Sequence, residues 1–288
     1  MPVRPSPTVR GRRLRYELRR LREQRNLTIE QVADRSDGDW TASAISRWER
    51  GDRRVRPVDL RALLDIYDVQ GSERDEMRSL AREARTRGWW QSYRGDAVPE
   101  WFETYLGLES EAATIREYDA ELIPGIFQTE DYYRAFMQAA PPAGNDQTIE
   151  RMISVRTARQ ERLTDDDPPE VWVVLNEATI RRVVGGFEVM RRQLERVATL
   201  AERPNISVQV LQFRSGAHPA MDGSFTMLGF PEPPDPDVVY LEGKMGSLYL
   251  EKEPEVERYR AVFQHLVAAA LGPEESRILI SEAAAALG

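Results

Sequence analysis

Arginines and short polar residues alternate with apolar residues between Thr41 and Arg56. The guanidinium fork of arginine donates hydrogen bonds to guanine or to phosphate, and short side chains let a helix backbone come close to base edges. We therefore expect this stretch to contact DNA. The residues predicted to do so are Thr41, Ala42, Ser43, Ser46, Arg47, Arg50, Arg53, Arg54 and Arg56.

A capped helix is expected to position these residues. Thr41 can accept a hydrogen bond from a backbone N–H of the first turn, and Gly51 can take the left-handed conformation that ends a helix. Ile45 and Trp48 are three residues apart, with the small Ala44 beside them, and form one apolar stripe. The polar face is then free to enter a groove. Any short capped surface helix has the same features, so the neighbouring segments decide between the two interpretations.

The charge of the chain is unevenly distributed. The net charge is −8, yet residues 1–56 contain fifteen Arg against eight Asp and Glu, which gives this segment a charge of +7 and the remainder −15. A basic N-terminal segment followed by an acidic remainder indicates a DNA-contacting module joined to a part with another function. The alternative is a solvated run of charges without a partner.

Two helices are expected before the capped segment. Leucines recur at i, i+4 and i+7 between Val9 and Arg25, which predicts an amphipathic helix. Thr28 and Gln31 have the spacing of a capping box, which predicts that a second helix begins there. A helix, a turn and the capped helix would then follow one another, as in a helix-turn-helix.

Two further helices are expected after it. Pro57 favours a helix start, and Ser72 opens a helix that runs to about Arg85. The sequence thus predicts an all-α five-helix helix-turn-helix domain over residues 9–85. The Pro-rich residues 1–8 are predicted to be a disordered arm.

Residues 10–70 resemble the Cro/repressor-type (XRE) helix-turn-helix family. Three spaced motifs carry the resemblance: Leu-Arg-x-Leu-Arg-Glu, Leu-Thr-x-Glu-x-Val-Ala and Ile-Ser-Arg-x-Glu-Arg-Gly. The resemblance implies that the segment from Thr41 reads the major groove of duplex DNA. The sequence departs from the family at two places. Ile29 stands where a Gln is usual. The turn around Asp37–Asp39 is about two residues longer than the usual spacing of the family.

Aromatic residues are concentrated where the two parts of the chain join. Residues 86–98 are predicted to be an aromatic linker that leads into the second domain. Five aromatic side chains in and after it are costly to leave exposed together. We expect them to lock the two domains together or to start the second core, rather than to form a ligand cage. They are Trp89, Trp90, Tyr93, Trp101 and Phe102.

Residues 99–288 are predicted to form an α+β domain with a largely antiparallel sheet. Apolar β-branched or alternating runs predict strands at 171–175, 206–213, 225–230, 238–242 and 247–250. The last four of these are joined by short turns, which favours antiparallel pairing among them. Helices are expected over 99–113, from Thr129 to Pro141, and over 148–163, 177–184, 187–202, 253–271 and 273–287.

Residues 88–282 are similar to the effector-like DUF5753 domain of actinobacterial Scr1-type antitoxin-like regulators. The similarity rests on Gly-Trp-Trp, Pro-Glu-Trp-Phe, Ile-Pro-Gly-Ile-Phe-Gln-Thr-Glu-Asp-Tyr, Arg-Gln-Glu-Arg-Leu and Gly-Ala-His-Pro-Ala-Met-Asp-Gly-Ser-Phe. The resemblance implies a bacterial transcription regulator with a small DUF397-type partner protein. It implies no known ligand, so a small-molecule effector stays unidentified. An antitoxin-like protein that acts mainly through its partner is the alternative.

Composition argues against several other classes. There is no cysteine, which excludes disulfides and thiolate zinc sites and suits the cytoplasm. No apolar run is long enough to span a membrane. Two histidines, no nucleophile elbow and no phosphate-binding loop argue against catalysis, and the Asp165–Asp167 run beside two prolines is expected to be a solvated turn rather than a metal site. We expect no catalytic residue, cofactor or metal, and we expect a homodimer, because a module of this size buries little on one half-site.

Overall fold

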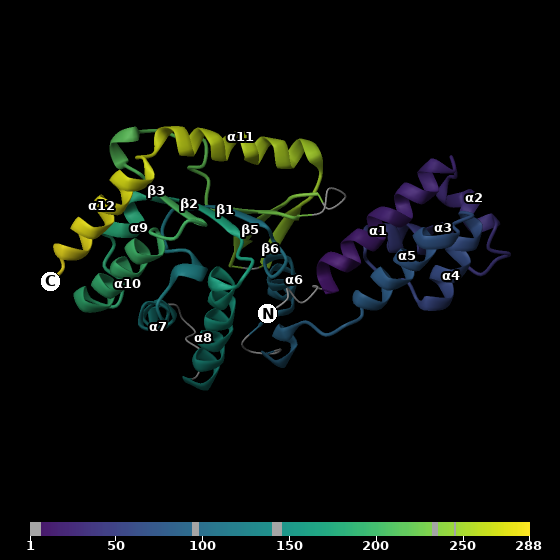
Figure 1. The fold of residues 1–288 in the computed structure, drawn as a ribbon, viewed down its shortest axis with the longest axis horizontal. Coiled ribbons are helices and arrows are strands. Elements are labelled where there is room, and N and C mark those ends of the chain that lie inside the picture. Colours follow the sequence, from purple (N-terminus) through teal and green to yellow (C-terminus); the bar gives the residue numbers. More distant parts are fainter. Residues whose placement is uncertain (1–6, 94–97, 140–145, 232–235, 245) are drawn as a thin grey trace. The chain divides into compact units, whose positions relative to one another are not determined.

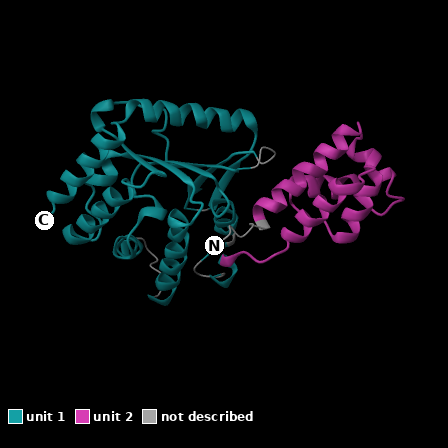
Figure 2. Cartoon of the chain, in the orientation of Figure 1, with its two compact units in different colours: residues 1–2, 90–231, 236–288 teal, residues 3–89, 232–235 magenta. Residues whose placement is uncertain are grey.

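A computed structural model describes residues 7–93, 98–139, 146–231, 236–244 and 246–288. These residues fall into two compact units, one up to Trp89 and the other from Trp90 onward (Figure 2). The first is helical and the second combines helices with a sheet. Within the described residues, no helix is long and apolar enough to cross a membrane.

The N-terminal unit contains five α-helices in its described part, as predicted. They are α1 (Pro7–Gln24), α2 (Ile29–Asp34), α3 (Ala42–Arg50), α4 (Pro57–Ile66) and α5 (Gly71–Glu83). Residues 1–6 of the expected disordered arm lie outside the described residues, whereas Pro7 and Thr8 belong to α1.

The core of this unit is built from the apolar stripes of its helices. The leucine repeat of α1 is buried, as its spacing predicts, with Leu14, Leu18 and Leu21 all inside. Ile45 and Trp48 of α3 join the same core. The inner face of α3 is therefore held against α1.

The C-terminal unit contains a mixed sheet of six strands in its described part. They are β1 (Thr114–Asp119), β2 (Glu170–Asn176), β3 (Ile206–Leu211), β4 (Phe225–Gly229), β5 (Val238–Gly243) and β6 (Gly246–Leu250), in the order β3-β2-β1-β4-β5-β6. β1 pairs with β4, β4 with β5 and β5 with β6 in antiparallel fashion, while β2 runs parallel to both β1 and β3. The prediction of an α+β domain with a largely antiparallel sheet is confirmed.

Two details of the sheet differ from expectation. β1 was not predicted as a strand, because Glu117 and Asp119 occupy alternate positions of it and hide the apolar alternation of a half-buried strand. The helix expected over 99–113 is correspondingly shorter, since α6 spans Glu100–Glu109 and the chain then enters β1. β3 pairs with β2 in parallel instead of joining the antiparallel run, because two helices connect β2 to β3 as a crossover.

Helices cover both faces of this sheet. They are α6, α7 (Glu130–Ala139), α8 (Asp146–Glu161), α9 (Glu177–Arg181), α10 (Phe187–Leu200), α11 (Glu253–Ala269) and α12 (Pro273–Ala285). α11 packs Phe263 and Leu266 against Tyr118 and Phe225 of the sheet. Figure 1 shows α7 and α8 on the opposite side of the sheet from α11. The predicted end of α7 at Pro141 lies outside the described residues.

Candidate DNA-binding surface

The caps of α3 are those that the sequence predicts. Thr41 has an extended backbone (φ −93°, ψ 156°), and its Oγ1 accepts a hydrogen bond from the Ala44 N–H at 3.2 Å. Gly51 is left-handed at φ 85°, and its N–H donates to the Trp48 carbonyl at 3.2 Å. Nη1 of Arg15 donates to the Arg50 carbonyl at 3.2 Å, which satisfies one free carbonyl at the end of the helix. Both ends of α3 are therefore fixed.

A pair of tryptophans fixes the inner face of α3. The rings of Trp40 and Trp48 meet edge to face with centroids 5.3 Å apart. Nε1 of Trp40 donates to Oδ1 of Asp59 at 3.3 Å, so the turn before α3 is bonded to the first turn of α4. The segments on either side of α3 thus hold each other in place.

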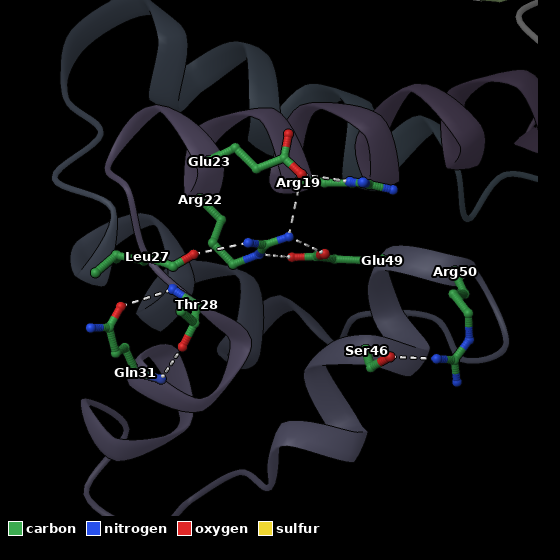
Figure 3. A network of polar contacts seen from close by, with 9 residues as sticks. All are labelled: Arg19, Arg22, Glu23, Leu27, Thr28, Gln31, Ser46, Glu49 and Arg50. Atoms are coloured by element: carbon green, nitrogen blue, oxygen red, sulfur yellow. Dashed lines mark hydrogen bonds and ion pairs between the residues drawn. The ribbon is translucent and has the colours of Figure 1, made fainter. Parts of the chain in front are cut away.

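A buried ion pair joins α1 to α3 (Figure 3). Nε of Arg22 donates to Oε1 of Glu49 at 2.7 Å and Nη2 donates to Oε2 at 2.9 Å. Nη1 of Arg22 donates to the Leu27 carbonyl at 2.9 Å, next to the capping box in which Thr28 and Gln31 exchange hydrogen bonds. The hydrogen bond to Glu49 raises the pKa of Arg22 above its usual value. One guanidinium therefore connects α1, the start of α2 and α3.

Arg47 stands on the exposed face of α3 near Ser43. Its Nε donates to the Ser43 carbonyl at 3.3 Å, and within the described residues neither terminal nitrogen has a bonding partner. Thr41 and Ser43 are also exposed, whereas Ala42 and Ser46 are half-buried. The terminal N–H groups of Arg47 are thus available to a partner outside the unit.

Arg50 and Arg56 are exposed but already paired with acids. Nε of Arg50 donates to Oδ2 of Asp52 at 3.0 Å, and Nη1 is bonded to Ser46. Arg56 binds Asp59 through two hydrogen bonds of 2.6 and 2.8 Å. Asp59 is 4% exposed, and the hydrogen bond from Arg56 holds its pKa below the usual value. Sequence reasoning missed this pairing, although the i, i+3 spacing of the two residues was its available signal.

Arg53 and Arg54 follow α3 as exposed loop residues. Within the described ranges no ion pair involves either of them. The Arg53 N–H donates to the Arg47 carbonyl at 3.3 Å, so the loop folds back onto the last turn of α3. The structure therefore brings Arg47 and Arg53 together at one end of the helix.

The chain matches known families over both units. Residues 13–77 match a helix-turn-helix domain, and residues 102–282, more than half of the chain, match a domain of unknown function, DUF5753. The chain belongs to the DUF5753 family. No curated protein and no solved structure matches it. The helix-turn-helix match indicates DNA binding and a role in transcription regulation, whereas the role of the DUF5753 domain is unknown.

The helix-turn-helix domain holds a further exposed arginine outside the predicted set. Arg35 follows α2, and within the described residues it forms no ion pair. The turn after it contains left-handed conformations at Asp37 (φ 51°) and Gly38 (φ 88°).

His218 and the Asp165–Asp167 run lie in the DUF5753 domain. His218 lies in a loop, with Nε2 3.4 Å from the Tyr118 hydroxyl, and burial lowers its pKa. Asp165, Asp166 and Asp167 are exposed in a turn. Over the part of the chain that the structure describes, no three His, Asp or Glu side chains are grouped to hold a metal ion.

Proposed function

We propose that this protein is a sequence-specific bacterial transcription regulator of the XRE type, whose α3 reads the major groove and which acts in the cytoplasm. The observation that carries the proposal is Arg47. It lies on the exposed face of a helix that caps, tryptophans and the Arg22–Glu49 ion pair hold rigidly, and its terminal N–H groups are unengaged within the described residues. A rigid helix that presents such a fork meets the geometric need of bidentate guanine recognition.

The other predicted residues take supporting roles in this proposal. Thr41, Ala42, Ser43 and Ser46 are short and let the backbone approach the bases, while Arg53 and Arg54 meet phosphates from the loop. Arg50 and Arg56 add charge to the same surface, but their carboxylate partners reduce their contribution.

Binding of the full chain to duplex DNA at several salt concentrations tests the proposal. Each phosphate that an arginine neutralises releases counterions, so log affinity should fall linearly with log salt at about −0.9 per contact. Fluorescence anisotropy with a labelled operator and a scrambled duplex measures this slope. Affinity that does not change with salt, or equal affinity for both duplexes, would contradict the proposal.

We propose that the DUF5753 domain supplies dimerisation, partner binding or effector sensing. The alternative is an antitoxin-like regulator that acts mainly through a small DUF397-type protein, and the charge of −15 on residues 57–288 favours it if that partner is basic. The variant R47A/R53A/R54A separates the two. Under the first proposal it loses regulation of a reporter, whereas under the alternative it retains regulation as long as the partner is present.

A further inference from the structure

A cavity of about 550 Å³ lies inside the C-terminal unit, between the sheet and helices α6, α7 and α8. Helices α7 and α8, whose residues line the cavity, are on the side of the sheet opposite α11 (Figure 1). Part of its wall is aromatic: Phe102 stacks on Tyr105 with ring centroids 5.3 Å apart, and Tyr240 lies 4.3 Å from Tyr105. This volume and this kind of wall are typical of small-molecule sites.

Three carboxylates line the same cavity. Glu117 and Asp119 alternate along β1 and share a face, and Glu242 comes from β5. Within the described residues, no basic side chain forms an ion pair with any of the three. Burial raises the pKa of Asp119 to about 7 and that of Glu117 well above its usual value, and the two carboxyl groups are hydrogen-bonded to each other. The charge of Arg159 favours the ionised form of Glu117, but burial outweighs it and keeps the pKa raised.

Gln128 adds an acceptor without a partner. It is 5% exposed and lines the cavity, and its Nε2 donates to the Ile123 carbonyl at 2.7 Å. Its Oε1 accepts no hydrogen bond from any described residue. A buried amide oxygen left unpaired costs free energy, so a ligand N–H that reaches it would stabilise the complex.

Three basic residues, Arg156, Arg159 and Lys244, also line the cavity. Arg159 is neutralised by Glu109 through hydrogen bonds of 2.6 and 2.7 Å, and both side chains are 7% exposed. The guanidinium carbon of Arg156 lies 3.8 Å from the centre of the Tyr133 ring, a cation–π contact. Lys244 is exposed. Among the described residues that line the cavity, the buried side-chain atom without a hydrogen-bond partner is an acceptor, Oε1 of Gln128.

We propose that this cavity binds a small molecule that carries a protonated amine on an aromatic or apolar body. Glu117, Asp119 and Gln128 accept hydrogen bonds from the ammonium group, and the body packs against the rings of Phe102 and Tyr105. The inference deepens the effector-sensing part of the proposed function by naming the chemistry of the ligand. Ligand binding is measurable without DNA, so its failure is distinguishable from a failure of DNA binding.

Isothermal calorimetry on the full chain with matched probes tests the proposal. The probes are benzylamine, phenethylamine and tryptamine, each compared with the alcohol and the carboxylic acid of the same skeleton. At least one amine should bind about tenfold or more tightly than its alcohol, which is the range expected for hydrogen bonds to a charged group. The proposal is overturned if no amine binds more tightly than its own alcohol or acid.

Variants show whether the carboxylates are responsible. E117Q/D119N keeps the size of both side chains and should abolish the preference for the amine. E121Q is the control, because Glu121 is exposed, pairs with Arg182 at 2.5 Å and does not line the cavity. It should bind as the wild type does. An undiminished preference in E117Q/D119N would refute the assignment.

A measurement on the wild type tests the site without depending on the folding of a variant. Because burial raises the pKa of both carboxyl groups, they should carry protons near pH 6.5, and a bound ammonium group should displace protons into the buffer. Five groups face this pair: Glu242, Ser224, Tyr105, Arg159 and the ion-pair partner of Arg159, Glu109. Calorimetry of the tightest amine in two buffers of different ionisation enthalpy should show proton release. Binding without proton release would count against the site.

Discussion

Arginines of the same surface differ in how much of their hydrogen-bonding capacity is already used. Arg56 gives two hydrogen bonds to a buried carboxylate and thereby supports the Trp40–Asp59 contact. Arg47 gives one weak bond to a backbone carbonyl and keeps its terminal nitrogens free within the described residues. We therefore propose that Arg47 recognises bases and that Arg56 has a largely structural role.

Replacing Arg47 with Ala should separate sequence-specific recognition from non-specific electrostatic binding to DNA. R47A should lose about 1–3 kcal/mol on the preferred site and little on random DNA, because a bidentate contact to guanine discriminates between bases. R53A should weaken binding to both DNAs alike and reduce the salt slope by about one. Titration of operator and scrambled duplexes at several salt concentrations measures both effects.

R61A is the matched control, since Arg61 is exposed on α4 and lies outside the predicted surface. It should change neither affinity nor slope by more than the experimental error. If R47A loses the same affinity for both duplexes, Arg47 contacts the phosphate backbone and does not contribute to sequence recognition.

The carboxyl pair of β1 makes stability depend on pH. Burial raises the pKa of Asp119 to about 7 in the folded state, above its usual value near 4. The folded state then holds its proton more tightly than the unfolded chain, so this residue costs stability progressively as the pH rises from about 4 to about 7. D119N should remove that cost and be more stable relative to wild type at pH 8 than at pH 5, as urea unfolding measures. Parallel profiles of the two proteins would contradict this.

At the level of elements, Gly51 allows a side chain of α1, Arg15, to lie close against the end of α3. Its φ of 85° is unfavourable for residues with a Cβ, and a Cβ there would overlap the Arg15 side chain that caps α3. G51A should therefore destabilise this helix end by about 1–2 kcal/mol. Gly38 provides the control, because its φ is similar at 88° but a Cβ would meet nothing within 4 Å. Hydrogen exchange of the α3 amides should accelerate more in G51A than in G38A, and equal acceleration would show that Arg15 contributes nothing.

Local signals predicted the elements that local interactions determine. The caps at Thr41 and Gly51 are visible in the sequence because each acts within one helical turn. β1 was not predictable in this way, since its inward-facing Glu117 and Asp119 contradict the pattern of a buried strand and only the surrounding tertiary structure keeps them there. The contact of Trp40 with Asp59 joins residues 19 positions apart, so the spacing along the chain does not reveal it.

For the molecule as a whole, charge is divided between the units as the tasks proposed for them require. The basic segment 1–56 belongs to the helical unit, whose surface carries Arg47, Arg53 and Arg54. The acidic remainder contains the DUF5753 domain, which repels DNA phosphates and is suited to other partners. We therefore expect contact with DNA to be confined to one end of the chain.

We expect the protein to act as a homodimer, because one helix-turn-helix module buries little surface on a half-site. The Ala- and Leu-rich helices α11 and α12 are the proposed dimer surface, and Ile278 of α12 is 47% exposed there. I278E should shift the protein toward the monomer, whereas M221E, at a loop residue that is 71% exposed, should not. Light scattering of the free protein and of its DNA complex measures the mass. A monomer in both states, or dissociation caused equally by both substitutions, would rule out this surface.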